Sequence, residues 1–181
     1  MYVVLTHKNA GVLGYMESLT NHMRMHWGQR GIAMHVMDYQ QTAKEAALAA
    51  NYHVRHYQDQ EPMKEEEIIP PALFNAVWAG FRSSDGNPDF WAKIFMSRSK
   101  QETQAWRDNG LVYVIVLTGV KDGTEFEVLK PFLGSHMKMS IGWPDADIVI
   151  DPRTELSGDW VQTENIKVFN EYQRRLRVGF E

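Results

Sequence analysis

The chain has 181 residues, which fits one domain, and its 44% apolar and 23% charged residues are ordinary proportions for a globular protein. It contains no cysteine, so disulfides, thiolate catalysis and cysteine-ligated zinc or iron–sulfur sites are excluded. The formal net charge of −4 gives no general attraction to the phosphate backbone of a nucleic acid.

The N-terminal third of the sequence predicts strands that alternate with helices. Strands are expected at 2–7 and 32–38, and helices at 15–27 and 42–52, the second of which is rich in alanine. The polar and acidic run at 58–71 ends in two prolines, which predicts a linker or an insertion.

The remaining sequence predicts mainly sheet. The segment 111–117 is apolar on both faces, which is typical of a central strand that is covered on both sides. A short helix is expected at 72–81, mixed helix and strand signals occupy 90–106, and further strands are expected at 125–129, 137–143, 146–150 and 160–168.

These patterns predict a single α+β domain over residues 1–181, in which an N-terminal strand–helix–strand–helix unit precedes a mostly antiparallel sheet. No segment approaches the roughly 18 continuous apolar residues that a membrane helix needs. The start of the chain shows no secretory signal. We therefore expect a cytoplasmic protein with no membrane partner.

Two short polar motifs flank the predicted C-terminal sheet. Ser97-Arg98-Ser99 precedes its first strand, and Gln162-Thr163-Glu164 lies in its last. Residues two apart on a strand share a face, so Gln162 and Glu164 would lie side by side. A carboxylate at a strand end can bind a ribose hydroxyl and stabilise an oxocarbenium-like centre. The simpler interpretation is a row of solvent-facing polar residues.

Together the motifs resemble the later motifs of the ADP-ribosyltransferase fold. The resemblance implies that NAD binds in a cleft between two sheets. It further implies that Glu164 is the catalytic carboxylate, that Gln162 orients the acceptor, and that Ser97 and Ser99 brace the site.

The same resemblance points to residues that would hold the cofactor. In the diphtheria-toxin-like branch a histidine and a tyrosine from the first two strands clasp the nicotinamide, and His7 and Tyr39 end the first two predicted strands here. In the arginine-type branch a strand arginine binds the cofactor, and Arg82 is the candidate.

A second constellation is similar to the nucleotidyltransferase signature. Gly134-Ser135 is followed by Asp145 and Asp147, which would face the same way on a strand and could hold Mg²⁺ with a nucleoside triphosphate. The alternative is an acidic edge strand that resists aggregation.

Three other features have simpler interpretations. The loop at 8–14 precedes a helix and could cradle phosphate, but its glycine spacing matches neither the dinucleotide nor the P-loop pattern, so a plain turn is expected. His22 and His26 lack a third metal ligand. The apolar stripe formed by Tyr15, Met16, Leu19, Met23 and Trp27 predicts core packing.

The leading hypothesis is a small transferase, and hence an enzyme, that uses a nucleotide, with NAD-dependent ADP-ribosyl transfer as its chemistry. The first alternative is metal-dependent nucleotidyl transfer at Asp145 and Asp147. The second is a non-catalytic binding or inhibitory protein whose methionine and tryptophan side chains form the contact surface. The expected partner is a nucleotide, and the sequence does not identify a protein or nucleic-acid acceptor.

Overall fold

The computed structural model describes residues 1–7, 13–57, 69–83, 87–121, 123–141, 145–150 and 158–178. In chain order the helices and strands are β1 (Tyr2–His7), α1 (Leu13–Gly28), β2 (Ala33–Asp38), α2 (Gln41–Tyr57), α3 (Pro71–Ser83), α4 (Phe90–Glu102), α5 (Gln104–Asp108), β3 (Tyr113–Lys121), α6 (Thr124–Leu133), β4 (His136–Ile141), β5 (Ile148–Ile150) and α7 (Gly158–Val178). No helix among these residues is long and apolar enough to cross a membrane.

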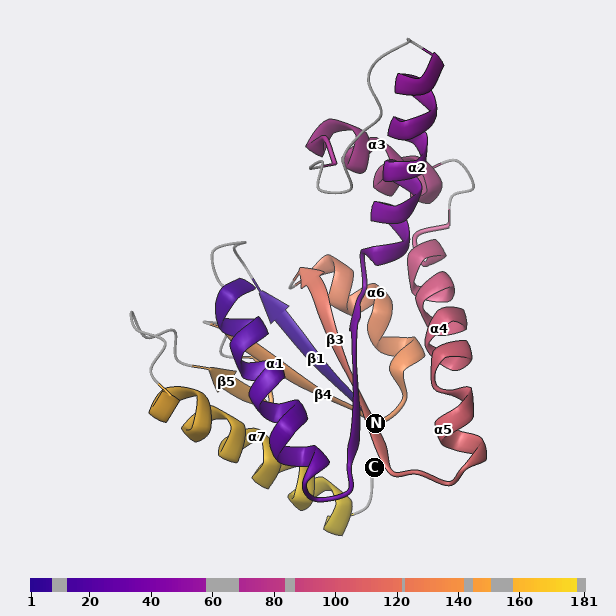
Figure 1. The fold of residues 1–181 in the computed structure, drawn as a ribbon. Coiled ribbons are helices and arrows are strands. Elements are labelled where there is room, and N and C mark those ends of the chain that lie inside the picture. The colour runs from indigo at the N-terminus through magenta and orange to yellow at the C-terminus, as the bar shows by residue number, and fades with distance from the viewer. Residues whose placement is uncertain are drawn as a thin grey trace.

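The five strands form one sheet in the order β2-β3-β1-β4-β5, and every neighbouring pair is parallel (Figure 1). The expectation of a mostly antiparallel α+β sheet was therefore wrong, and the chain has an α/β fold. Strands that are apolar on both faces, such as β3, are typical of a parallel sheet because crossover helices cover both sides.

The error arose from two segments that were expected as strands. The segment 125–129 lies in α6, and 160–168 lies in α7. In α6 the buried side chains are Phe126, Leu129 and Leu133, which recur at spacings of three and four residues. That period is helical, and it places one stripe of the helix against the sheet.

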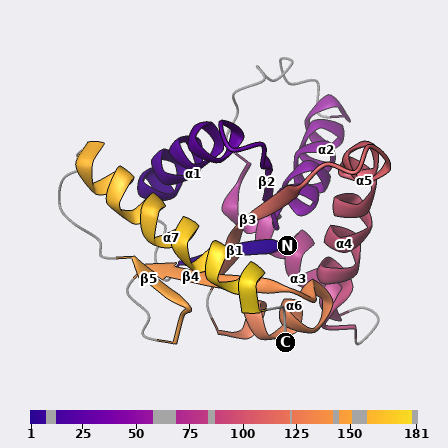
Figure 2. The same ribbon diagram turned by 90° about the horizontal axis from the view of Figure 1, so that it is seen from below.

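Helices cover the sheet on both faces (Figure 2). One apolar cluster joins α1 and α7 to side chains such as Val3 and Leu5 of β1. The other joins α2, α4 and α6 to Val4 of the same strand. Successive strand side chains point to opposite faces, so β1, which is buried on both sides, supplies both cores.

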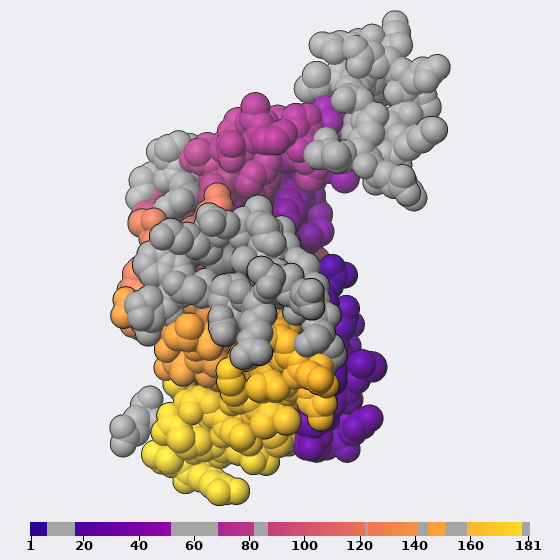
Figure 3. All heavy atoms as spheres, turned by 90° about the vertical axis from the view of Figure 1, so that its left-hand side faces the viewer, coloured from indigo at the N-terminus to yellow at the C-terminus, as the bar shows by residue number. Residues whose placement is uncertain are grey.

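Helices α1 and α7 lie side by side on their face of the sheet, where Figure 3 shows them in indigo and yellow. Leu19, Met23 and Trp27 of α1 are fully buried, which confirms the predicted core packing for these three residues, whereas the side chains of Tyr15 and Met16 lie outside the described residues. The Trp27 indole Nε1–H donates a hydrogen bond of 3.0 Å to Oδ1 of the buried Asn165 in α7. The two helices are thus joined by a polar contact inside an apolar layer.

Helices α2 and α3 extend beyond the carboxyl ends of the strands (Figure 1). Helix α3 is held to α4 by aromatic stacking: Trp78 stacks on Trp91 with ring centroids 5.1 Å apart and planes 4° from parallel, and Phe81 stacks on Phe90 at the same centroid distance of 5.1 Å. Trp91 Nε1–H also donates to the Trp78 carbonyl at 2.9 Å. These contacts position α3 above one end of the sheet.

Candidate functional site at the carboxyl ends of the strands

The sheet has a topological switch point between β1 and β3. These strands are neighbours, yet the chain leaves β1 for α1 on one face and leaves β3 for α6 on the other. In open α/β sheets such a divergence opens a crevice at the carboxyl ends of the strands, where ligands bind. Here His7 pairs with Lys121 at those ends, and the connection 8–12, outside the described residues, joins β1 to α1.

Strand β3 contains a bulge close to this point. Its pairing with β1 shifts between Val4 and Thr6, which face Leu117 and Val120, so β3 has one extra residue there. Gly119 lies in this bulge with φ of +74°, a conformation that is rare for residues with a side chain. A Cβ at Gly119 would lie 2.1 Å from Oδ1 of Asp38. The bulge therefore lets β3 pass close to the last residue of β2.

Asp38 is held in place by several contacts. Its Oδ1 accepts the Gln40 N–H at 2.9 Å, its Oδ2 forms an ion pair with Lys44 of α2, and Gly119 packs against it. A cavity of about 270 Å³ lies beside it, bounded also by Thr118 of β3. Asp38 is therefore a fixed carboxylate at the end of a strand with open space next to it.

The far wall of this cavity is charged and comes from α4. Arg98 Nε donates to Glu102 at 2.6 Å, its Nη1 lies 3.2 Å from Glu45, and His35 Nε2 lies 2.5 Å from the other oxygen of Glu102. Burial would raise the pKa of Glu102, but the hydrogen bonds from Arg98 and His35 outweigh it and keep the pKa below its ordinary value. Glu102 therefore stays ionised and holds Arg98 beside the cavity.

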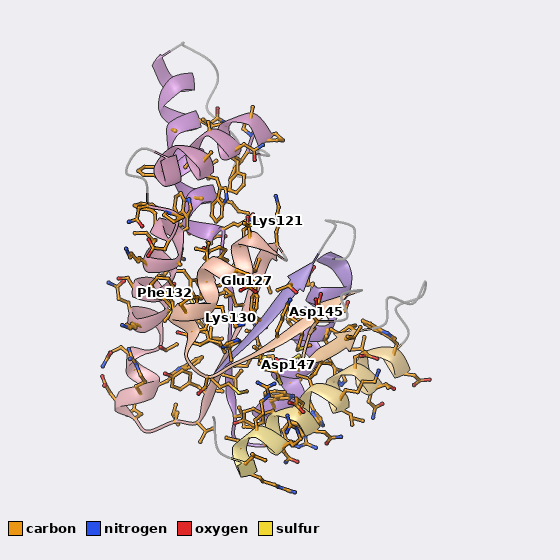
Figure 4. The ribbon with its side chains drawn as sticks, turned by 180° about the vertical axis from the view of Figure 1, so that it is seen from behind. Lys121, Glu127, Lys130, Phe132, Asp145 and Asp147 are labelled. Carbon is orange, nitrogen blue, oxygen red and sulfur yellow. The ribbon has the colours of Figure 1, made fainter. Side chains whose placement is uncertain are left out.

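Lys121 supplies a cation at the carboxyl end of β3, where Figure 4 labels it. Its backbone N–H donates to Oε2 of Glu125 in the first turn of α6 at 2.8 Å. Its side chain is exposed, and no carboxylate in the described part of the chain pairs with the ammonium group. An exposed lysine next to the connection between β1 and α1 favours anion binding there.

Glu164, the expected catalytic carboxylate, lies in helix α7 and not at a strand end. The residue is 2% exposed, and Lys167 Nζ donates to its Oε1 at 2.6 Å. Its Oε2 is buried and has no hydrogen-bond partner among the described residues. Gln162 is exposed on the same helix, so the expected strand geometry of the Gln-x-Glu pair is corrected.

The serine motif lies in α4. Ser97 is exposed, whereas Ser99 is buried and its hydroxyl lies 3.0 Å from the Tyr2 hydroxyl. Tyr2 begins β1, so Ser99 contacts the end of that strand opposite to the switch point. The Tyr39 ring is also buried, 5.6 Å edge-on from Trp78. These positions indicate packing roles for Ser99 and Tyr39.

The remaining expected cofactor residues are His7 and Arg82. His7 ends β1 at the switch point, and Arg82 lies near the end of α3, but their side chains lie outside the described residues. The seven residues expected for an NAD site are thus distributed over β1, the end of β2, α3, α4 and α7, and those described do not surround one cavity.

The second predicted constellation does come together. Gly134, Ser135, Asp145 and Asp147 line one cavity of about 490 Å³. Both oxygens of Asp147 are engaged, however: Arg175 contacts Oδ1 at 2.6 Å, and the Lys138 N–H donates to Oδ2 at 2.7 Å. Within the described ranges no three histidine or acidic residues are placed to hold a metal ion. The arrangement therefore does not favour a two-aspartate metal site.

No protein-family model and no curated protein matches the chain. Among solved structures, a dephospho-CoA kinase from Campylobacter jejuni is similar with a TM-score of 0.46 and 12% sequence identity. The similarity covers 96% of this chain and 97% of that one. At this level of similarity, function has to be inferred from the geometry of the chain itself.

Two features of the site were not anticipated from sequence. From sequence, Asp38 at the end of the second predicted strand would suit a ribose hydroxyl, but the dinucleotide glycine pattern is missing, and nothing in the sequence assigned a role to Gly119. A signal was present in the sequence, because a glycine inside a run of apolar strand residues often marks a bulge or a close approach of backbones. The neighbour that Gly119 approaches could not be predicted, since β2 ends at Asp38 and β3 begins at Tyr113, with helices α2 to α5 between them in the chain.

Proposed function

We propose that the protein is a nucleotide-using transferase that binds the phosphates of a nucleoside triphosphate at the connection 8–12 between β1 and α1. The observation that carries the proposal is the switch point between β1 and β3, from which α1 begins at Leu13. A helix that begins at such a point directs its amino-terminal N–H groups and positive dipole end toward the crevice. The exposed Lys121 adds a cation beside it.

The arrangement fits transfer of a phosphoryl group to an acceptor hydroxyl. Such transfer depends mostly on positioning and on stabilising the charge of the phosphates, and a carboxylate commonly orients the attacking hydroxyl. Asp38 would take this role, because it is fixed at the neighbouring strand end and borders an open cavity. The magnesium salt of the triphosphate would be the substrate.

Two earlier hypotheses receive less support. NAD-dependent ADP-ribosyl transfer needs an accessible catalytic carboxylate, but Glu164 is buried in α7 and paired with Lys167. Nucleotidyl transfer through a metal held by Asp145 and Asp147 requires a third protein ligand near them, and within the described residues no three histidine or acidic residues are placed to hold a metal ion.

Binding can be tested by following the backbone amide NMR signals of the full chain. We expect ATP with Mg²⁺ to shift the signals of Gly119, Lys121 and Gly123, and Lys121→Gln to weaken binding by about five- to tenfold through loss of one charge-assisted contact. Lys100→Gln, a change of an exposed lysine on α4, should have no effect. Shifts with NAD alone, and none with ATP, would replace this proposal by the ADP-ribosyl hypothesis.

Catalysis can be tested separately through slow transfer to water, measured as ADP release. Asp38→Asn should abolish release while ATP still shifts the same amide signals, because binding and acceptor orientation depend on different groups. Undiminished ADP release by a folded Asp38→Asn protein would show that this carboxylate has no part in transfer.

A further inference from the structure

A second cavity lies at the other end of the sheet from the proposed nucleotide site. Its volume of about 490 Å³ is within the range of small-molecule sites. It is bounded by α6, the Gly134-Ser135 turn, the first residues of β4, the segment before β5 and the last turns of α7. Figure 4 labels Lys130 of α6 and Asp145 and Asp147 of the segment before β5, which line two of these walls.

Three charged residues of α7 and Asp147, which precedes β5, neutralise one another along one wall of the cavity. Glu171 accepts hydrogen bonds from Arg174 at 2.7 Å and from Arg175 at 2.8 Å. Arg175 also contacts Asp147 at 2.6 Å and donates to the His136 carbonyl at 2.7 Å. Two guanidinium groups thus balance two carboxylates, and this network leaves no net charge for a ligand.

Two opposite charges remain available in the cavity. Lys130 on α6 and Asp145 before β5 are both exposed, and neither has an ion-pair partner in the part of the chain that the structure describes. They also form no ion pair with each other, although they line the same cavity. The space between them is therefore open to a ligand that carries complementary groups.

The floor of the cavity adds a polar and an aromatic surface. His136 Nδ1 lies 2.8 Å from the Gly134 carbonyl, and its ring meets that of Phe126 at a centroid distance of 5.9 Å. The Lys138 ammonium lies 4.8 Å from the centroid of the same phenyl ring. Lys138 thus adds positive charge to the lining of the cavity, which also includes Ser135.

We propose that this cavity binds a small phosphorylated sugar, with the phosphate at Lys130 and the sugar hydroxyls at Asp145. Lysine is a common phosphate ligand because its ammonium acts as a compact point charge. A carboxylate repels phosphate but accepts hydrogen bonds from hydroxyls, so Asp145 favours a ligand that has both groups over a bare phosphate ion. This site is additional to the proposed nucleotide site and does not depend on it.

The two charged residues give opposite predictions for two probes, ribose 5-phosphate and inorganic phosphate. Lys130→Gln should weaken binding of both by about tenfold, because each loses a charge-assisted contact. Asp145→Asn should weaken ribose 5-phosphate by about fivefold through loss of a hydroxyl acceptor. The same change should strengthen inorganic phosphate by about twofold, because a like charge is removed.

Amide NMR titrations of the full chain would locate the binding, since phosphate also fits the nucleotide site. The expected result is saturable shifts at Ser135, His136 and Lys138, with Lys100→Gln binding as the wild type does. Shifts confined to Gly119 and its neighbours would overturn the proposal, as would no saturable shift. The proposal would also be overturned if Lys130→Gln bound the probes as tightly as the wild type does. The same holds if Asp145→Asn changed the affinity for both probes in the same direction.

Discussion

Replacing Gly119 by alanine should strongly destabilise the protein, because the residue meets two separate constraints. Its φ of +74° costs a residue with a Cβ about 1–2 kcal/mol. The new Cβ would also lie 2.1 Å from Oδ1 of Asp38, so the carboxylate would have to leave its hydrogen bond with the Gln40 N–H and its ion pair with Lys44. Loss of contacts to a charged group adds about 1.5–3 kcal/mol. The sum is about 2.5–5 kcal/mol.

Gly110 provides a matched control for the first constraint. Its φ of +65° is similar, but no atom lies within 4 Å of an added Cβ. Gly110→Ala should therefore cost only about 1–2 kcal/mol. The difference between the two variants measures the close approach of β3 to Asp38.

Urea unfolding followed by circular dichroism would measure both costs. With a denaturant slope of about 2–3 kcal/mol per molar, the midpoint should fall by about 1–2.5 M for Gly119→Ala and by about 0.3–1 M for Gly110→Ala. In an Asp38→Ala background, the cost of Gly119→Ala should drop to that of Gly110→Ala, because the clashing carboxylate is absent. Equal costs for the two glycines in the wild-type background would refute the reasoning.

Two further predictions concern α7. Asn165→Ala should lower the free energy of unfolding by about 2–3 kcal/mol, because it leaves the buried Trp27 N–H without an acceptor. Asn170 is exposed on the same helix, so the control Asn170→Ala should change the urea midpoint little. Similar midpoints for the two variants would contradict the polar link between α1 and α7. Hydrogen bonding to Arg174 outweighs burial and lowers the pKa of Glu171 from 4.5 to about 2. The ionised Glu171 therefore stabilises the folded protein fully above pH 5, and this contribution is lost as the pH falls toward 2. Glu171→Gln should therefore lower the free energy of unfolding by about 1–2 kcal/mol at pH 7, allowing for solvent screening. The difference in stability between the wild type and this variant should shrink between pH 5 and pH 2, and a constant difference would contradict this ion pair.

Local patterns in the sequence were sufficient for the first half of the fold. The expected strands at 2–7 and 32–38 and the helices at 15–27 and 42–52 correspond to β1, β2, α1 and α2, because each has a clear apolar period between turn residues. The apolar run at 111–117 likewise predicted a strand covered on both sides, and β3 is such a strand. The type of each of these elements depends only on which of its faces must be buried in an apolar core, and the local sequence contains that information.

Strand direction and the site depended on tertiary structure. Two strands pair in parallel or antiparallel according to hydrogen bonds between segments far apart in the chain and to the face of the sheet that each connection crosses. The local spacing of apolar residues contains neither kind of information. The same holds for the approach of Gly119 to Asp38 and for the shared cavity of Lys130 and Asp145. The sequence by itself determined which residues are buried in the early elements, and only the packed sheet decided which polar residues meet at its two ends.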